Sequence, residues 1–146
     1  MTVEDEVRAA SETFYEALNS TFNGDPNPMM DIWLHTPTVT AMRPNGGCEI
    51  GWDKLWPAWK QVAELFSGGH VEITKRTIYV SGDVAYEIGL ERGTLSPGGE
   101  TIKAEHRVTN IFERSNGDWK IIHHHTDKSE GAMEALRRLD DTQSAT

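Results

Sequence analysis

A tight hairpin signal in the last third of the chain constrains the fold more than any other stretch. Two runs rich in β-branched and aromatic residues flank Asn116-Gly117 within the segment 108–127, VTNIFERSNGDWKIIHHHTD. Asn-Gly is the strongest short signal for a two-residue hairpin turn, because both turn positions take a positive φ. The segment therefore predicts two long antiparallel strands, and any fold of this chain has to contain them.

The turn also predicts which side chains share a face of the hairpin. Side chains opposite each other on two antiparallel strands lie on the same face. Counting outward from the turn gives these opposed pairs: Phe112 and Ile121, Asn110 and His123, Val108 and His125. His124 falls on the other face, as a surface or interface residue. A register shift of one residue would exchange the two faces.

The same count extends over three earlier strands, expected at 71–80, 84–95 and 101–114. With turns at Ser81-Gly82 and Pro97-Gly98, one face of the sheet carries a polar set: Arg76, Glu87, His106, Asn110, His123 and His125. The other face carries an apolar set: Ile73, Tyr79, Val84, Tyr86, Ile88, Leu90, Ile111 and Ile122. We predict that the polar face is concave and lines a site, and that a partner covers the apolar face.

Helices are expected before these strands, because apolar residues recur there at spacings of three and four. The expected elements are long helices at 2–22 and 51–66, a short helix ending near Trp33, a strand at 38–42, a turn at 45–47 and a last helix at 129–139. Helices followed by an antiparallel meander predict the α+β class. The chain of 146 residues fits one domain, which we place at 1–140, with 141–146 as a frayed tail.

The charge of the chain argues against some partners. A formal net charge of -9 disfavours nucleic acids and anionic membrane surfaces, because both are polyanions. No apolar run is long enough to span a bilayer, and the polar amino terminus lacks the pattern of a signal peptide. The single cysteine, Cys48, excludes an intramolecular disulfide. We therefore expect a cytoplasmic protein with neither a nucleic acid nor a membrane as its partner.

The hairpin resembles the last two strands of SnoaL-like proteins in the nuclear transport factor 2-like superfamily. It is also similar to the end of the association domain of calcium/calmodulin-dependent protein kinase II. In these families a tryptophan after the turn, apolar residues and a His-x-His pair end the sheet. The matching residues here are Trp119, Ile121, Ile122, His123 and His125. The resemblance implies a nuclear transport factor 2-like (cystatin-like) cone, in which a curved mixed or antiparallel sheet wraps around amino-terminal helices and leaves a pocket.

The resemblance also implies a chemistry for the polar face. SnoaL-like and ketosteroid isomerase-like relatives act next to a carbonyl, which requires a base and a donor to the developing oxyanion. The candidate catalytic bases are His123 and Glu87. The candidate ligand-binding residues are Arg76, His106, Asn110, His125, Trp56 and Trp59. Asn110 stands where the kinase association domain has an arginine, and Arg76 is the alternative source of positive charge.

Structural interpretations stay open for several of these residues. His123 and His125 also fit semi-buried histidines bonded to backbone or hydroxyl groups, and Arg76 with Glu87 fits a structural ion pair. Tryptophans at helical spacing are usually core residues. Strand alternation points His124 away from its two neighbours, so we expect no metal and no cofactor. A site from His123 and His125 with either His106 or Glu87 is the remaining metal alternative, since non-heme iron sites use two histidines and a carboxylate.

Two functions are compatible with this sequence. The first is a small-molecule-binding domain whose concave pocket takes a polar or carbonyl-containing ligand, as an acid–base isomerase, cyclase or hydratase. The second is a non-catalytic dimerisation or ligand-sensing module, similar to the kinase association domain. The apolar face predicts a homodimer in both cases.

Overall fold

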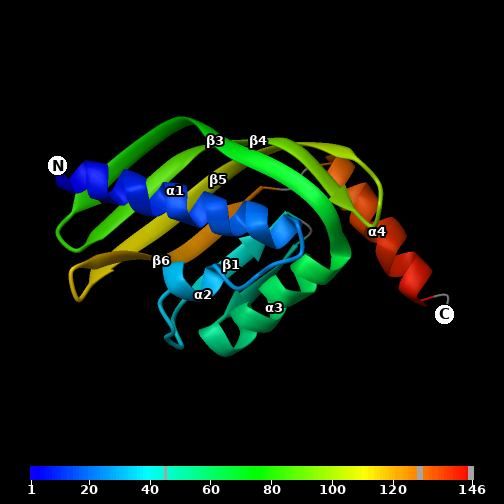
Figure 1. Ribbon diagram of the computed structural model, residues 1–146, viewed down its shortest axis with the longest axis horizontal. Helices are drawn as coiled ribbons and strands as arrows, with labels where there is room; N and C mark the ends of the chain where they lie inside the picture. Colours follow the sequence, from blue (N-terminus) through cyan, green and yellow to red (C-terminus); the bar gives the residue numbers. More distant parts are fainter. Residues whose placement is uncertain (45, 128–129, 145–146) are drawn as a thin grey trace.

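The computed structural model describes residues 1–44, 46–127 and 130–144. These residues form four helices and one six-stranded sheet that curves over the amino-terminal helix (Figure 1). The helices are α1 (Val3–Phe22), α2 (Met29–Ile32), α3 (Trp52–Leu65) and α4 (Glu130–Ser144). The strands are β1 (Thr40–Arg43), β2 (Gly46–Ile50), β3 (Phe66–Ser81), β4 (Val84–Pro97), β5 (Ile102–Ser115) and β6 (Asp118–Thr126).

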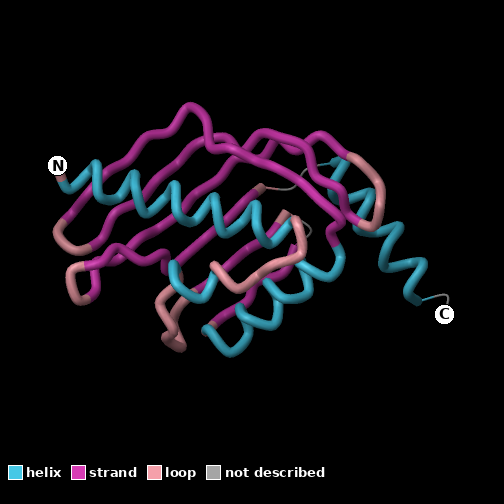
Figure 2. The backbone as a smooth tube through the Cα atoms, in the orientation of Figure 1, coloured by secondary structure: helices cyan, strands magenta, loops and turns pink. Residues whose placement is uncertain are grey.

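The sheet has the strand order β2-β1-β6-β5-β4-β3. β1 runs parallel to β6, and all other neighbours in the sheet are antiparallel, so the sheet is mixed. Figure 2 shows the long strands bending across α1, which lies on what we call the concave face, together with α3. The opposite face is called convex below. The predicted α+β architecture with a curved mixed sheet is confirmed.

Helix α1 begins where its sequence dictates. Thr2 caps the helix by accepting a hydrogen bond from the Asp5 amide, and the Asp5 carboxylate accepts one from the Thr2 amide in return. Such a capping box satisfies two backbone donors that a helix start would otherwise leave free. The apolar stripe predicted for this helix is buried from Val7 to Leu18 and faces the sheet.

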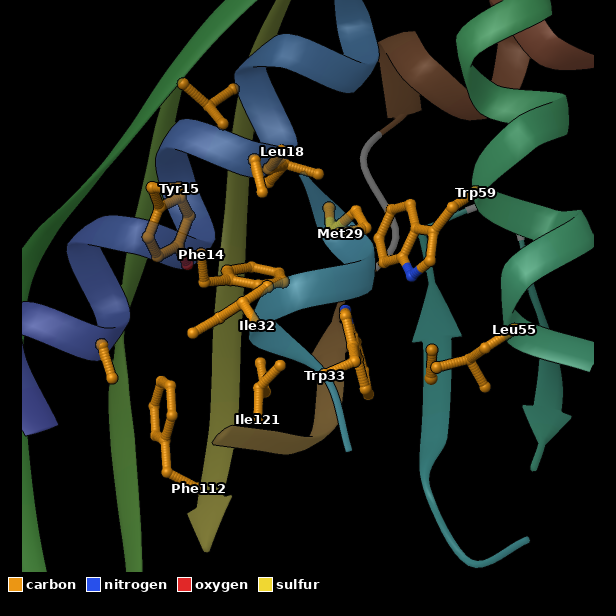
Figure 3. Packing of buried hydrophobic residues seen from close by; sticks show 14 of the residues in the cluster. Phe14, Tyr15, Leu18, Met29, Ile32, Trp33, Leu55, Trp59, Phe112 and Ile121 are labelled. Atoms are coloured by element: carbon orange, nitrogen blue, oxygen red, sulfur yellow. The ribbon is translucent and has the colours of Figure 1, made fainter. Parts of the chain in front are cut away.

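The core lies between α1, α2, α3 and the concave face. Phe14 of α1 packs near Trp33, with ring centroids 6.3 Å apart, and Trp33 in turn lies near Trp59 of α3 (Figure 3). Phe112 and Ile121 close this core from the sheet and are fully buried. Each such side chain contributes about 1.5–3 kcal/mol when it leaves water. The packing fixes the helices over the end of the sheet that carries the polar residues.

The predicted hairpin turn is confirmed. Asn116 and Gly117 have φ values of 53° and 84°, and Phe112 stands opposite Ile121 as counted from the sequence. Two other turns are displaced so that the pairing moves by two residues, which leaves the faces unchanged. Glu87 thus faces Asn110 rather than Val108, and both lie on the concave face with His106. The prediction of a polar concave face is correct for these three residues.

A β-bulge in β6 makes the predicted register wrong beyond Ile121. Ile122 has no cross-strand partner, so Ile111 pairs with His123 and Asn110 pairs with His124. The extra residue reverses the alternation of side chains along the rest of the strand. His124 therefore lies on the concave face, and His123 and His125 lie on the convex face, contrary to the prediction.

A second bulge divides β3. Lys75 takes a φ of 53°, and the pairing with β4 shifts between Thr74 and Thr77. Ile73 consequently faces Glu91 and packs against the core, whereas the sequence placed it on the convex face. Ile122, at the other bulge, also packs against the core rather than joining the convex face. Neither bulge has a turn residue that would reveal it in the sequence.

Two further differences concern strand β2 and the end of helix α4. Strand β2 was not expected, because its glycines suggested a turn, and Asn45 of that predicted turn lies outside the described residues. Helix α4 continues to Ser144 instead of fraying after Leu139, and residues 145–146 lie outside the description. The domain boundary at residue 140 stays a prediction. No helix in the described ranges is long and apolar enough to cross a membrane.

The bulge at Lys75 gives a test of the fold. A lysine in the left-handed region is strained by about 1 kcal/mol, whereas glycine adopts this conformation freely. Lys75→Gly is expected to raise the free energy of unfolding by up to about 1 kcal/mol in chemical denaturation. Thr77→Gly, an exposed neighbour in ordinary strand geometry, should lower it by about 0.5–1 kcal/mol. An equal loss in both variants would contradict the bulge.

Candidate functional site

A cavity of about 130 Å³ lies between the concave face, α1, α3 and α4. Its walls are mainly apolar and come from α1, α3, β4 and α4, including Leu18, Phe22, Trp59, Leu95, Leu136 and Leu139. Five polar side chains of the sheet also line it: Arg43, Glu91, His106, His124 and Thr126. A mostly apolar cavity with a few polar groups is the usual form of a small-molecule site.

Glu91 lies between the two histidines of the cavity. His106 Nδ1 is 3.6 Å from Glu91 Oε1, and His124 Nε2 is 3.9 Å from Glu91 Oε2. Glu91 and His106 face each other on β4 and β5, and the bulge in β6 brings His124 beside them. All three side chains are buried. Ionisable groups held together in a cavity are candidates for acid–base chemistry.

Asn110 links His124 to Tyr15 of α1 and determines which ring nitrogen of His124 carries the proton. Its amide nitrogen donates to Tyr15 Oη at 3.2 Å and to Glu87 Oε1 at 3.1 Å. Its carbonyl oxygen therefore faces His124 Nδ1, 2.7 Å away, and accepts the proton that this nitrogen must carry. His124 Nε2, the other ring nitrogen, is left with a free lone pair.

Burial keeps His124 neutral. The ring is fully buried between the rings of Phe14 and Trp59, with centroids 5.0 Å and 6.2 Å away. This loss of solvation lowers the pKa of His124 from 6.5 to about 4, although the nearby charge of Glu91 acts in the opposite direction. At neutral pH the imidazole is therefore unprotonated at Nε2 and able to accept a proton.

Glu91 and Tyr15 hold opposite protonation states. Burial alone would raise the pKa of Glu91, but its interactions with His106, His124 and Tyr15 lower this pKa overall. Burial, together with the Glu91 charge, raises the pKa of Tyr15 well above 10.0. Glu91 is therefore a carboxylate, and Tyr15 remains a phenol that donates to Glu91 Oε2 at 2.8 Å.

Four side chains of the cavity wall carry buried polar atoms without a hydrogen-bond partner. These atoms are Arg43 Nε, Trp59 Nε1, both ring nitrogens of His106 and the Thr126 hydroxyl. Buried polar atoms without partners are rare and destabilising, so such groups commonly mark the place of a water or ligand. The Thr126 hydroxyl and a protonated ring nitrogen of His106 are able to donate to an oxygen-bearing ligand.

The predicted ion pair between Arg76 and Glu87 is present, outside the cavity lining. Arg76 Nε lies 3.2 Å from Glu87 Oε2, and Ser11 Oγ donates to Glu87 Oε1 at 2.7 Å. Glu87 has no exposed surface. Its place among fixed donors favours a structural role, in which Glu87 orients Asn110, and its role as a base stays a prediction.

His123 and His125 do not reach the cavity. His123 Nδ1 makes a 2.6 Å hydrogen bond with Thr40 Oγ1 on β1, the structural alternative considered from the sequence. Partial burial and the neighbouring His125 lower the pKa of His123. His125 lines an open groove on the convex face, beside Leu90 and Arg107. The bulge at Ile122 separates both residues from the carboxylates with which they were grouped.

The two predicted tryptophans of α3 have different surroundings. Trp59 is buried and lines the cavity next to His124. Trp56 is half-buried outside it, stacked on Trp52 at 5.7 Å with the Lys60 ammonium over its ring. Only Trp59 is therefore able to contact a ligand in the cavity.

Sequence reasoning missed Glu91, Tyr15, Thr126 and the role of His124. Glu91 shares the alternation of Glu87 on the same strand, so the strand pattern already placed it on the polar face. Tyr15 lies four residues after Ser11 on α1, and both side chains donate to carboxylates of β4. That spacing could have marked a polar stripe on the helix. Nothing in the sequence could have placed His124, because its position depends on the bulge.

Metal chemistry has no evident centre in the described part of the chain. Among those residues, no group of three or more histidine, cysteine, aspartate or glutamate side chains could hold a metal ion. The histidine pair of the alternative metal site, His123 and His125, faces away from His106 and Glu87. The arrangement present is suited to moving a proton inside an apolar cavity.

Comparisons with solved structures agree on one fold. A nuclear transport factor 2-like superfamily protein from Salmonella enterica superposes with a TM-score of 0.76 at 19% identity, over 90% of this chain and 96% of that one. A candidate dehydratase of the same family from Streptomyces avermitilis gives 0.75 at 21% identity, over 86% and 95%. A candidate association domain of calcium/calmodulin-dependent protein kinase II from Thiobacillus denitrificans gives 0.70 at 19%, over 84% and 94%.

At these identities the solved structures identify the fold alone. The comparison with curated proteins gave no match. The sequence profile of the SnoaL-like domain, in contrast, matches residues 7–126, which include every strand, α2, α3 and all but the first turn of α1. The chain therefore belongs to the SnoaL-like domain family and has the nuclear transport factor 2-like fold.

Proposed function

We propose that this protein binds a small carbonyl compound in the cavity and moves a proton at the carbon next to the carbonyl. The reaction class is that of an isomerase, cyclase or hydratase, and a cytoplasmic location stays part of the proposal. The observation that carries it is the neutral His124, whose Nε2 lone pair lies beside the Glu91 carboxylate in the cavity. The structural relatives do not decide the matter, since one is named a candidate dehydratase and another a kinase association domain.

The roles follow from the fixed hydrogen bonds. His124 Nε2 takes the proton from the substrate carbon, and the electron pair left behind forms the double bond of an enolate. Asn110 Oδ1 continues to accept the Nδ1 proton of the resulting imidazolium, and the Glu91 charge stabilises that cation. The developing oxyanion needs donors, which the unpartnered His106 and Thr126 supply. Return of the proton to another carbon completes an isomerisation.

Proton exchange of a ketone tests this assignment. The wild-type protein is expected to speed the exchange of the methyl protons of acetophenone with D2O, followed by proton NMR. His124→Gln removes the base and should slow the catalysed exchange by roughly a hundredfold or more. His123→Gln is the matched control, since the neighbouring ring lies on the convex face, and should exchange like the wild type. Equal losses in the two variants would exclude His124 as the base.

The neutral state of His124 also predicts a dependence of stability on pH. The pKa of its ring is about 4 in the folded chain and 6.5 when the ring is exposed, so the unfolded chain takes up the proton first as the pH falls. This residue should therefore lower the free energy of unfolding between pH 6.5 and 4, by on the order of 3 kcal/mol. Denaturation curves of His124→Gln should show a shallower decline over this window than those of the wild type and of His125→Gln. Three parallel declines would refute the neutral buried ring.

The alternative function, a dimerisation module, is supported by the convex face. Tyr79, Val84, Tyr86 and Ile88 expose between 42% and 56% of their surface there. The rings of Tyr79 and Tyr86 stack at 5.4 Å, which presents a flat apolar patch. Patches of this kind are uncommon on soluble monomers and commonly mark interfaces. We propose a two-fold homodimer through this face, compatible with a catalytic cavity on the other side of the sheet.

Substitution at the centre of the patch tests the dimer. Ile88→Asp places a carboxylate of each copy near the two-fold axis, so light scattering should find monomers where the wild type gives dimers. Ile50→Asp is the control, because Ile50 is 62% exposed on β2, away from the patch. A monomeric wild type at high concentration, or a dimeric Ile88→Asp variant, would reject this interface.

A further inference from the structure

Helix α4 closes the cavity although it lies beyond the family domain. The SnoaL-like profile ends at Thr126, and α4 begins at Glu130. Leu136, Leu139 and Asp140 nevertheless form part of the cavity wall, opposite residues of α1 and α3. Figure 1 shows α4 across the end of the sheet where the turn between β4 and β5 lies. The size of the cavity therefore depends on an element outside the residues that the family profile matches.

The contacts of α4 hold it firmly in this place. Ala135 is completely buried, and Leu139 lies so close to Gly98 that a Cβ on Gly98 would overlap it. Arg138 Nε donates to Glu100 Oε1 at 2.9 Å, which ties the helix to the same turn. These contacts fit the leucines against the cavity and leave Arg137, on the same turn of helix, exposed to solvent.

The volume between the cavity walls limits the size of the ligand. A dry apolar cavity of about 150 Å³ holds one benzene molecule in a protein interior. The present cavity of about 130 Å³ has comparable apolar walls, with the polar groups of the sheet exposed within it. A single ring bearing one carbonyl group fills such a space, and a second fused ring would have to displace the wall.

We propose that α4 makes this cavity specific for carbonyl compounds with a single ring, and that Leu136 and Leu139 set the size limit. The inference rests on the proposed function for the carbonyl group, and adds the ring size to it. Shortening both leucines to alanine removes side-chain carbons from the wall without touching His124, Glu91 or His106. The enlarged cavity should then accept two fused rings.

Two ketones with the same acetyl group and different ring systems test the size limit. Calorimetric titration with acetophenone and 2-acetonaphthone should show that the wild-type protein prefers the single ring by about tenfold or more, since overpacking a rigid wall is unfavourable. The Leu136→Ala/Leu139→Ala protein should lose or reverse this preference. Arg137→Ala, an exposed change on the same helix, should keep it. Leu136→Ala alone should give an intermediate preference, and this single variant replaces the double variant in the test if the double variant does not fold.

The outcomes separate this inference from the proposed chemistry. Equal affinity of the wild type for both ketones would overturn the size limit, whatever the variants do. A preference that survives the shortening of the leucines would overturn the role of α4. Size-selective binding without His124-dependent proton exchange would refute the proposed reaction and leave this inference standing. Failure of the wild type to bind either ketone would overturn both.

Discussion

The structure depends on supplying donors to two carboxylates, Glu87 and Glu91, that one strand buries inside the cone. A buried charge without partners is destabilising by several kcal/mol, so each carboxylate requires hydrogen bonds from whatever packs above it. Helix α1 provides them, through Ser11 to Glu87 at 2.7 Å and Tyr15 to Glu91 at 2.8 Å. The apolar stripe of the helix holds it on the sheet, and these two directional bonds fix where along the sheet it lies.

Asn110 links the buried Glu87 carboxylate to the protonation of His124. Its amide nitrogen donates to Glu87 and Tyr15, so its carbonyl oxygen is left to accept the hydrogen bond from His124 Nδ1. The Glu87 carboxylate, two strands away, therefore determines which nitrogen of the imidazole is protonated. Because each hydrogen atom in this network has a single acceptor, the His124 ring has only the tautomer protonated at Nδ1. The free lone pair then faces the cavity with Glu91, which is the property that the proposed proton transfer needs.

The two faces of the sheet carry side chains of opposite kinds. The concave face carries ionisable groups in an apolar enclosure, where desolvation lowers the pKa of His124 to about 4 and raises that of Tyr15. The convex face carries exposed aromatic and aliphatic side chains with no helix over them among the described residues. Because the side chains of a strand alternate, one sequence can supply both surfaces, and a bulge is enough to move a residue from one to the other.

The sequence by itself determined the α+β class, the turn at Asn116-Gly117, the capped first helix and a concave face with Glu87, His106, Asn110 and Arg76. These features depend on local turn chemistry and on periodicity, which are both written in neighbouring residues. Only the tertiary structure decided that His124, rather than His123 or His125, enters the cone. Ile122 bulges in a strand of ordinary β-forming residues, so no local pattern encodes the bulge. The bulge is stabilised by packing on both faces of the sheet, since it lets Ile122 pack against the core. The closure by α4 is of the same kind, because it depends on how Leu139 fits against Gly98, a residue far earlier in the chain.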